Sequence, residues 1–469
     1  MKLLVPAVLV GGLLVAGCAS TEEDQTAQPV AAAGAGPAGF DQSFGQAGRA
    51  RVALSGSSGD RFLAVTAAAD GATYAAGYVT EGEDQAMAVA RVRRDGTLDP
   101  AFGTGGVAVV NVAEGGKAAE VARAVVVLPS GKILIGGPIE TAPTATGDAA
   151  KDTDIALVRF DAGGRPDASF GTDGVARIDL GAGRATSPTA YVGDSSWGLA
   201  GLAGDKAVVF GSSLAQGADR TDADYVAVGV SAAGALDPAF GTGGSLRIDI
   251  ARSGDTARTV VAQPDGKLVG TGYSRGTDNI VRPVLVRFDA AGVFDPSFGT
   301  AGVATATVLD GVAESYAVAL QGDGYIVAGY GRGADDKEKV DVVVERFTAA
   351  GTWDRSFGTD GLTRIDLANE DDRARNLAVL PDGRIVLAGS GKRSATDIDS
   401  MVVLLGRDGA PVEGFGERGN LLTDLGGSAD GWFGITLTAD RTAVVVAGFR
   451  GHEKAETAKD DAVLARIAL

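Results

Sequence analysis

The sequence has few of the residues that most often carry nucleophile and zinc chemistry. Its 469 residues include one cysteine, Cys18, and one histidine, His452. A single cysteine cannot form an intrachain disulfide, and neither a zinc cluster nor a Cys–His catalytic pair can be assembled around it. Any triad or imidazole metal site would have to use His452, which has no second histidine beside it. We therefore expect no catalytic residue of these classes.

Positive charge and aromatic side chains are also scarce. The chain has 42 Lys+Arg against 60 Asp+Glu, a formal net charge of −18, and 6% aromatic residues. Binding to a nucleic-acid backbone needs a concentrated positive surface, so we expect no nucleic-acid partner. The hydrophobic content of 45% excludes a disordered chain, whereas 71 glycines indicate very frequent turns.

The N-terminal segment has the pattern of a targeting signal. Leu3 to Val15 form an apolar run that is shorter than the ~20 residues needed to span a bilayer, which favours a signal sequence. The adjoining Val15-Ala16-Gly17-Cys18 resembles the lipobox of bacterial lipoproteins, whose cysteine becomes lipid-modified and N-terminal after cleavage. An ordinary secretory signal with a chance cysteine, or a buried thiol, is the alternative.

The lipoprotein resemblance implies a location. Residues 1–17 would be the signal peptide, and Cys18 would carry the lipid that anchors the chain to a membrane without a spanning helix. Ala19 stands where an aspartate would retain a lipoprotein in the inner membrane. The resemblance therefore implies the cell envelope, at the outer membrane of a Gram-negative bacterium, on its periplasmic or surface face. Residues 18–39 are rich in Ala, Gly, Pro and acid and predict a flexible tether.

One unit recurs along the rest of the chain. The dipeptide Phe-Gly returns at intervals of 58–70 residues, most often inside Asp-Pro-x-Phe-Gly or a close variant, as in TLDPAFGTGGVAVV and VFDPSFGTAGVATA. The outer two copies are degraded, as expected for terminal repeats. The motif phenylalanines are Phe44, Phe102, Phe170, Phe240, Phe298, Phe357 and Phe415.

Each unit contains four short apolar runs in a fixed order, such as VAVVNV, RAVVVL, KILIGG and IALVRF. The runs are rich in β-branched residues, and Pro/Asp/Gly turns separate the second from the third, so each unit predicts four antiparallel strands. Units repeated radially limit exposed sheet edges, as in β-propellers. We therefore predict an all-β fold over residues 40–469, a seven-bladed β-propeller with four antiparallel strands per blade. A linear β-solenoid is the alternative.

The same stretches carry a family resemblance. LDPAFGTGG, the PDGKL-type hairpins and the VRFDAAG strands resemble the delta-60 repeat family of bacterial secreted and surface proteins, over about residues 40–469. The resemblance implies a propeller fold and a secreted context. It implies no activity, because the family has no catalytic motif to carry over.

The repeated motif suits a structural role. A phenylalanine can bury about 150–250 Å² between adjacent blades, and the Asp, Pro and Gly around it favour a tight bend. A ligand-binding residue would not need to recur in every unit. We therefore expect the motif phenylalanines to hold the blades together.

An aspartate also recurs, at the start of the fourth predicted strand of several units. A ring of such carboxylates could bind Ca²⁺, but no loop has the spaced Asp/Asn/Gly order of a dedicated calcium loop. We favour water-exposed aspartates that cap turns, so calcium is a candidate only, and we expect no other metal or cofactor. The candidates are Asp154, Asp224, Asp341, Asp399 and Asp461.

These observations favour a membrane-anchored extracytoplasmic lipoprotein that acts as a non-enzymatic binding or scaffolding propeller. Its partner would be a protein or a glycan. The alternative is a hydrolase or lactonase-like propeller enzyme with a carboxylate site, which could hold calcium, at the central channel. Carboxylates clustered on the axis would favour the enzyme, and a channel lined by Val, Ala and Gly would count against it.

Overall fold

The chain divides into two units, Met1–Gly36 and Pro37–Leu469, and only the second is described below. Cys18, His452 and the predicted signal peptide lie outside the described residues. The computed structural model describes residues 39–54, 59–82, 84–112, 119–141, 152–187, 190–217, 220–250, 252–335, 339–367, 370–394, 396–451 and 461–469.

The second unit is built from four-stranded antiparallel sheets whose strands are consecutive in the sequence. This confirms the predicted all-β fold and four-stranded antiparallel sheets. The predicted unit is shifted by one strand, because the run VAVVNV, predicted as the first strand of its unit, pairs at Val107–Val110 with the preceding sheet, and the strand predicted as fourth is third in its sheet. Four sheets stand alone. The first contains β3 (Arg61–Ala67), β4 (Thr73–Glu81), β5 (Asp84–Val92) and β6 (Val107–Val110), and the second β7 (Ala124–Val127), β8 (Ile133–Thr141), β9 (Asp152–Phe160) and β10 (Val175–Ile178). The third contains β13 (Ser195–Gly201), β14 (Ala207–Leu214), β15 (Ala223–Val230) and β16 (Ser245–Ile248). The fourth contains β25 (Asp372–Val379), β26 (Ile385–Ser394), β27 (Asp397–Leu405) and β28 (Asn420–Thr423).

Two further sheets depart from this pattern. One has eight strands, in which a single parallel pair, Val281 with Val312, joins two four-stranded halves. Its strands are β17 (Asp255–Ala262), β18 (Leu268–Arg275), β19 (Val281–Phe288), β20 (Val303–Thr305), β21 (Val312–Gln321), β22 (Gly324–Arg332), β23 (Asp341–Phe347) and β24 (Leu362–Ile365).

The other combines the two ends of the unit. Strands β1 (Gly39–Phe40) and β2 (Arg49–Val52) both pair antiparallel with β31 (Asp461–Ala468), which continues into β30 (Ala443–Arg450) and β29 (Asp430–Leu437). The remaining elements are the short hairpin β11 (Arg184–Ser187) and β12 (Ala190–Val192) and the 3₁₀ turn η1 (Ala203–Asp205). Among the described residues no helix is long and apolar enough to cross a membrane.

Turn glycines and apolar strands explain why each repeat folds this way. The predicted hairpins between the second and third apolar runs carry glycines with positive φ, +84° at Gly131 and +85° at Gly266, a conformation that favours glycine. Both faces of each sheet are apolar because each sheet packs on its neighbours. Val89 of one sheet and Ile135 of the next, for example, lie in one buried cluster.

The motif phenylalanine packs against the following sheet. Each of the seven is at most 2% exposed. Phe298 lies so close to a turn of the next repeat, in the other half of the eight-stranded sheet, that a Cβ on Gly351 would come within 2.9 Å of its ring. The neighbouring amide of Gly299 donates a hydrogen bond to the carbonyl of Ala350 in that same turn, at 2.8 Å. The motif therefore fastens one sheet to the next.

An arginine in the third strand completes this fastening. Arg287 Nε donates to Asp295 Oδ2 of the motif at 3.0 Å, and Arg287 Nη1 donates to the carbonyl of Ala349 in the next repeat at 2.7 Å. The guanidinium also lies 4.5 Å from the ring centroid of Phe298. The equivalent ion pairs are Arg91–Asp99, Arg159–Asp167, Arg346–Asp354 and Arg466–Asp41.

Candidate functional site

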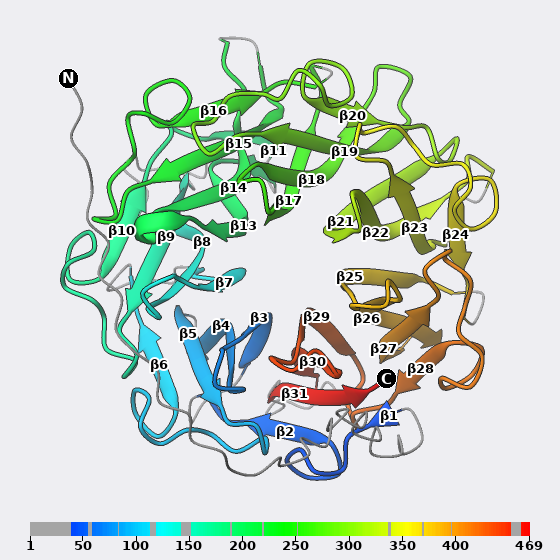
Figure 1. Ribbon diagram of the computed structural model, residues 1–469. Helices are drawn as coiled ribbons and strands as arrows, with labels where there is room; N and C mark the ends of the chain where they lie inside the picture. Colours follow the sequence, from blue (N-terminus) through cyan, green and yellow to red (C-terminus); the bar gives the residue numbers. More distant parts are fainter. Residues whose placement is uncertain are drawn as a thin grey trace, which may run out of the picture. The chain divides into compact units, whose positions relative to one another are not determined.

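A pocket lies where the first strands of successive repeats meet. These strands, β3, β7, β13, β17, β21, β25 and β29, are the ones nearest the centre in Figure 1. The cavity has a volume of about 110 Å³. We call it the central pocket, and its lining residues are Leu63, Arg123, Trp197, Arg258, Thr259, Tyr316, Arg375, Asn376 and Phe433.

β-Bulges aim these side chains into the pocket. In each of several inner strands the pairing with the second strand shifts register, which leaves one or two residues outside the ladder. A bulge of this kind bends the strand and redirects a side chain. The residues left out are Leu63, Trp197, Arg258 with Thr259, Tyr316, Arg375 and Phe433. Arg123 lies at the matching place, directly before β7.

Three of the lining residues are arginines without a carboxylate partner. Within the part of the chain that is described, Arg123, Arg258 and Arg375 form no ion pair, and the Nε atom of each is buried without a hydrogen-bond acceptor. Arg258 is only 6% exposed. Burying a guanidinium N–H without an acceptor is unfavourable, and a bound anionic group would relieve this cost by accepting a hydrogen bond.

Aromatic rings hold the three guanidinium groups in place. Arg123 and Arg258 lie 3.9 and 4.2 Å from the ring centroid of Trp197. Arg258 and Arg375 lie 4.3 and 5.0 Å from the ring centroid of Tyr316. Cation–π attraction of this kind orients an arginine without neutralising its charge. The pocket is therefore both positively charged and lined by flat apolar surfaces.

A chain of hydroxyl groups connects the pocket to the carboxylate of Glu314. Arg258 Nη2 donates to the hydroxyls of Tyr273 and Tyr316, at 3.0 Å each. The hydroxyl of Tyr316 lies 3.1 Å from that of Tyr330, which donates to Glu314 Oε2 at 2.6 Å. Burial, together with Tyr316 and Glu314, holds the pKa of Tyr330 well above its usual range, so Tyr330 remains a donor at neutral pH.

The electrostatics of the pocket favour an anion. Burial, and then repulsion by Arg258, lowers the pKa of Arg123 to about 10. Arg123 is still protonated at neutral pH, and within the described residues its Nε has no acceptor and the side chain forms no ion pair. A bound oxyanion would supply that counter-charge, and guanidinium groups bind carboxylate, sulfate and phosphate in bidentate fashion.

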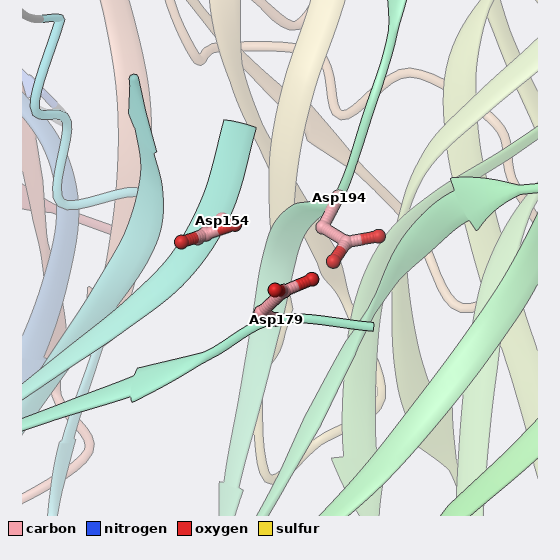
Figure 2. A group of neighbouring side chains, drawn as sticks. All are labelled: Asp154, Asp179 and Asp194. Carbon is pink, nitrogen blue, oxygen red and sulfur yellow. The ribbon is translucent and has the colours of Figure 1, made fainter. Parts of the chain in front are cut away.

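The calcium candidates lie elsewhere, in separate groups, and none of them lines the central pocket. Asp154, Asp224 and Asp341 each join a different set of three aspartates whose carboxylate oxygens lie within 4.8 Å of one another. Figure 2 shows the first set. The sets are Asp154–Asp179–Asp194, Asp224–Asp249–Asp255 and Asp341–Asp366–Asp372. Calcium binding itself stays a prediction.

The other two candidates are held by arginines. Arg393 Nε donates to Asp399 Oδ2 at 2.5 Å. Asp461 forms ion pairs with Arg51 and with Arg450. A single ring of five equivalent carboxylates is therefore not what the fold assembles, because the sheets place these aspartates in different surroundings.

Each set of three follows one plan, which bridges two repeats. Its first aspartate lies in the third strand of a sheet, its second directly follows the fourth strand, and its third is at the start of the next sheet. The third aspartate accepts a backbone amide from the crossing segment, as Asp194 Oδ2 does from Leu180 N at 2.6 Å and Asp255 Oδ2 does from Ile250 N at 2.9 Å. These buried aspartates therefore fix the connection between neighbouring sheets.

The surroundings raise the pKa values of several of these carboxyls. Burial raises the pKa of Asp194 to about 6 and that of Asp372 to about 7. Burial, and then repulsion by Asp179 and Asp152, raises the pKa of Asp154 to about 6. Close carboxylates disfavour one another's ionisation unless a cation joins them.

Sequence reasoning did not find the central pocket, although a signal was present. The lining residues follow the motif phenylalanine at a fixed distance in the later repeats, with 18 residues from Phe298 to Tyr316 and from Phe357 to Arg375. The residue type at this position changes from repeat to repeat, whereas a position with a structural role, such as the motif phenylalanine, has the same residue type in each repeat. A search for in-register positions with variable, functional side chains would have identified the pocket.

A family described as a domain of unknown function (DUF5122) β-propeller matches the chain at residues 68–102 and 263–298. These stretches end at the motif residues Phe102 and Phe298 and contain the second and third strands of their sheets. The chain carries β-propeller repeats. The match supports the prediction of β-propeller repeats.

Comparison with other proteins adds no functional assignment. No curated protein matches the chain. A protein of unknown function from Dyadobacter fermentans is similar in structure, with 10% identity, a TM-score of 0.41 and coverage of 74% of this chain and 94% of that one. Sqt1 from Chaetomium thermophilum, bound to the N-terminus of the ribosomal protein L10, has 13% identity, a TM-score of 0.41 and coverage of 88% and 98%.

Proposed function

We propose that this chain is a non-enzymatic binding propeller of seven blades whose central pocket binds an anionic group. The observation that carries the proposal is the set of three arginines, Arg123, Arg258 and Arg375, whose Nε atoms are buried and which lack carboxylate partners within the described residues. Aromatic rings beside them would contact the flat body of the ligand. A uronic-acid or sulfated glycan, or an acidic group of a protein, has this combination of charge and flat surface.

Two observations support seven blades closed into a ring. The eight-stranded sheet counts as two blades, because a single residue pair joins its halves. The last blade takes its outer strands from the other end of the unit, since β1 and β2 pair with β31. The same junction carries the ion pair between Arg466 Nε and Asp41 Oδ2, at 2.8 Å, which is the contact that links strand and motif in the other blades.

The alternative, a hydrolase or lactonase-like enzyme, requires carboxylates from several blades to meet at the channel. Among the described residues the lining of the central pocket contains no Asp or Glu. Glu314 reaches Arg258 only through the hydroxyls of Tyr330 and Tyr316. No observation therefore favours the enzyme over the binding protein.

Removal of a pocket arginine is expected to weaken anion binding. Hydrogen bonds to a charged group contribute about 1.5–3 kcal/mol, so Arg123→Gln and Arg375→Gln should each raise the Kd about 10- to 100-fold. Isothermal titration with glucuronate and with sulfate measures this, with glucose as the neutral probe. The matched control is Arg384→Gln, because Arg384 pairs with Asp382 at 2.7 Å on an outer hairpin and should leave binding unchanged. Equal binding of glucose and glucuronate, or unaltered binding in both pocket variants, contradicts the proposal.

We further propose that the protein is anchored at Cys18 to the outer membrane of a Gram-negative bacterium. The lipobox Val15-Ala16-Gly17-Cys18 supports this. Cys18→Ala is expected to abolish labelling by palmitate and to release the protein from the membrane fraction, because the acyl chains supply the membrane affinity. Cell fractionation with radiolabelled palmitate measures both effects. A Cys18→Ala protein that still takes up label or stays with the membrane would rule out lipidation at this residue.

A further inference from the structure

Asp154, Asp179 and Asp194 form a group of carboxylates that spans two blades. Asp154 lies in β9 and Asp179 directly follows β10 of the same sheet, whereas Asp194 directly precedes β13 of the next sheet. One carboxylate oxygen from each lies within 4.8 Å of the others. In Figure 2 the three side chains extend toward one another from different segments of the chain.

The carboxyl of Asp194 is buried and only half satisfied. Asp194 is 0% exposed, and its Oδ2 accepts the amide of Leu180 at 2.6 Å. Its Oδ1 is buried and accepts no hydrogen bond, although the hydroxyl of Ser213 lies near the carboxyl and lowers its pKa. Buried polar atoms of folded proteins nearly always have a partner, so an unpartnered carboxylate oxygen inside an acidic group is a place where a ligand can bind. The Oδ1 atoms of Asp255 and Asp372 in the two corresponding groups are unpartnered as well, so the groups differ in whether an arginine accompanies the carboxylates.

The corresponding groups in other blades contain a cation that this one lacks. Arg220 donates to Asp224 Oδ1 at 3.0 Å and to Asp249 Oδ2 at 2.9 Å, so a guanidinium offsets part of the negative charge of that group. In a third group Arg364 binds Asp341.

In the group of Figure 2 the matching arginine acts elsewhere. Arg177 occupies the position of Arg364 but donates to the carbonyl of Val112. Within the described residues the carboxylate of Asp154 has no hydrogen bond or ion pair, although Arg177 attracts it at longer range. The same architecture thus occurs with an arginine in one blade and without one in another.

We propose that Asp154, Asp179 and Asp194 bind a hard divalent cation, Ca²⁺ by preference, that joins the two neighbouring blades. A site made of carboxylate oxygens alone, without His or Cys, selects Ca²⁺ or Mg²⁺ over softer metals. Ca²⁺ tolerates irregular geometry and completes its six to eight ligands with water, which suits three carboxylates on separate segments. In this group the cation would play the part that the guanidinium of Arg220 plays in the group of Asp224.

Calcium titration of the whole protein tests this site independently of the central pocket. Wild-type protein stripped with a chelator should bind Ca²⁺ in calorimetry, and its melting temperature should rise with the logarithm of the Ca²⁺ concentration. Asp179→Asn, at an exposed position that should not impair folding, and the double variant Asp154→Asn/Asp179→Asn should lose this response. Asp249→Asn, in the group that contains Arg220, is the matched control and should keep the calcium response.

A second readout distinguishes a metal site from a merely structural cluster. Without Ca²⁺ the double variant should melt at or above the wild-type temperature, because two mutually repelling carboxylates have been removed. The proposal is overturned if stripped wild-type protein shows no calcium heat and no melting shift, or if the double variant keeps the full response. Anion binding at the central pocket should be the same in all these variants. The calcium experiment can therefore fail while the anion-binding proposal holds, and the reverse.

Discussion

Phe298→Ala is expected to reduce the free energy of unfolding by about 3–5 kcal/mol, the usual loss for a buried phenylalanine. Phe298 is 0% exposed, and its ring packs edge-on against Tyr325 with the centroids 5.7 Å apart. It also lies beneath the guanidinium of Arg287. The substitution would leave a cavity at the contact between two blades, where the backbone of the Gly351 turn cannot move in without breaking its own hydrogen bonds. Chemical denaturation with fluorescence detection measures the loss.

The matched control is Val293→Ala in the same blade, at a valine that is 58% exposed. Surface substitutions of this kind change stability by about 0.5 kcal/mol or less. A Phe298→Ala protein as stable as the Val293→Ala protein would show that the motif phenylalanine does not hold the blades together.

Glu345→Val is expected to stabilise the protein, and increasingly so with rising pH. Glu345 is 1% exposed in β23, its Oε2 has no hydrogen-bond partner, and burial raises its pKa to about 8. The matching residue in other blades, directly before the strand arginine, is Val158 or Val286. Valine at 345 removes a buried carboxyl and keeps a side chain that this position accommodates elsewhere.

The pH dependence follows from the raised pKa. Between about pH 4.5 and pH 8 the folded state retains the proton of Glu345 that the unfolded state has released, so the stability of the wild type falls as pH rises through this window. The accumulated penalty at the upper end is on the order of 4 kcal/mol, since one pKa unit corresponds to about 1.4 kcal/mol. The advantage of Glu345→Val should therefore grow from pH 5 to pH 8 and then level off.

Denaturation midpoints of both proteins at pH 5, 6.5 and 8 measure this advantage. Glu413→Val, at an exposed glutamate, serves as the control and should show no such pH-dependent gain. A constant difference between wild type and Glu345→Val across the three pH values would mean that Glu345 is not protonated inside the fold.

The regular part of the fold was predictable because the same physics acts in every repeat. Short β-branched runs between Gly- and Pro-containing turns specify strands and hairpins locally, and the fixed position of residues such as Phe298 marks a contact made in each blade. An arginine also recurs in the third strand of several sheets, but the sequence does not show its role. Arg287 contacts Asp295 in its own repeat and Ala349 in the next, and the second contact depends on how the sheets pack.

The sites were less predictable because each is formed by residues of different repeats, which meet only when the sheets pack together. Arg123, Arg258 and Arg375 are far apart in the sequence and meet only because bulged inner strands converge. Asp154 was recognisable as a recurrent strand aspartate, but its companions Asp179 and Asp194 lie on a segment that crosses to the next blade. The two companions recur as well, as Asp249 with Asp255 and as Asp366 with Asp372, but the sequence analysis aligned only the strand aspartate and missed them.

The most direct test of the central claim is a crystal structure of the protein with selenate, whose anomalous signal locates an oxyanion. We expect a selenate in the central pocket, within hydrogen-bond distance of at least two of the guanidinium groups of Arg123, Arg258 and Arg375, with Trp197 and Tyr316 still packed against them. A pocket without selenate at saturating concentration, or pocket arginines paired with carboxylates of the protein itself, would contradict the claim that this propeller binds anions at its centre.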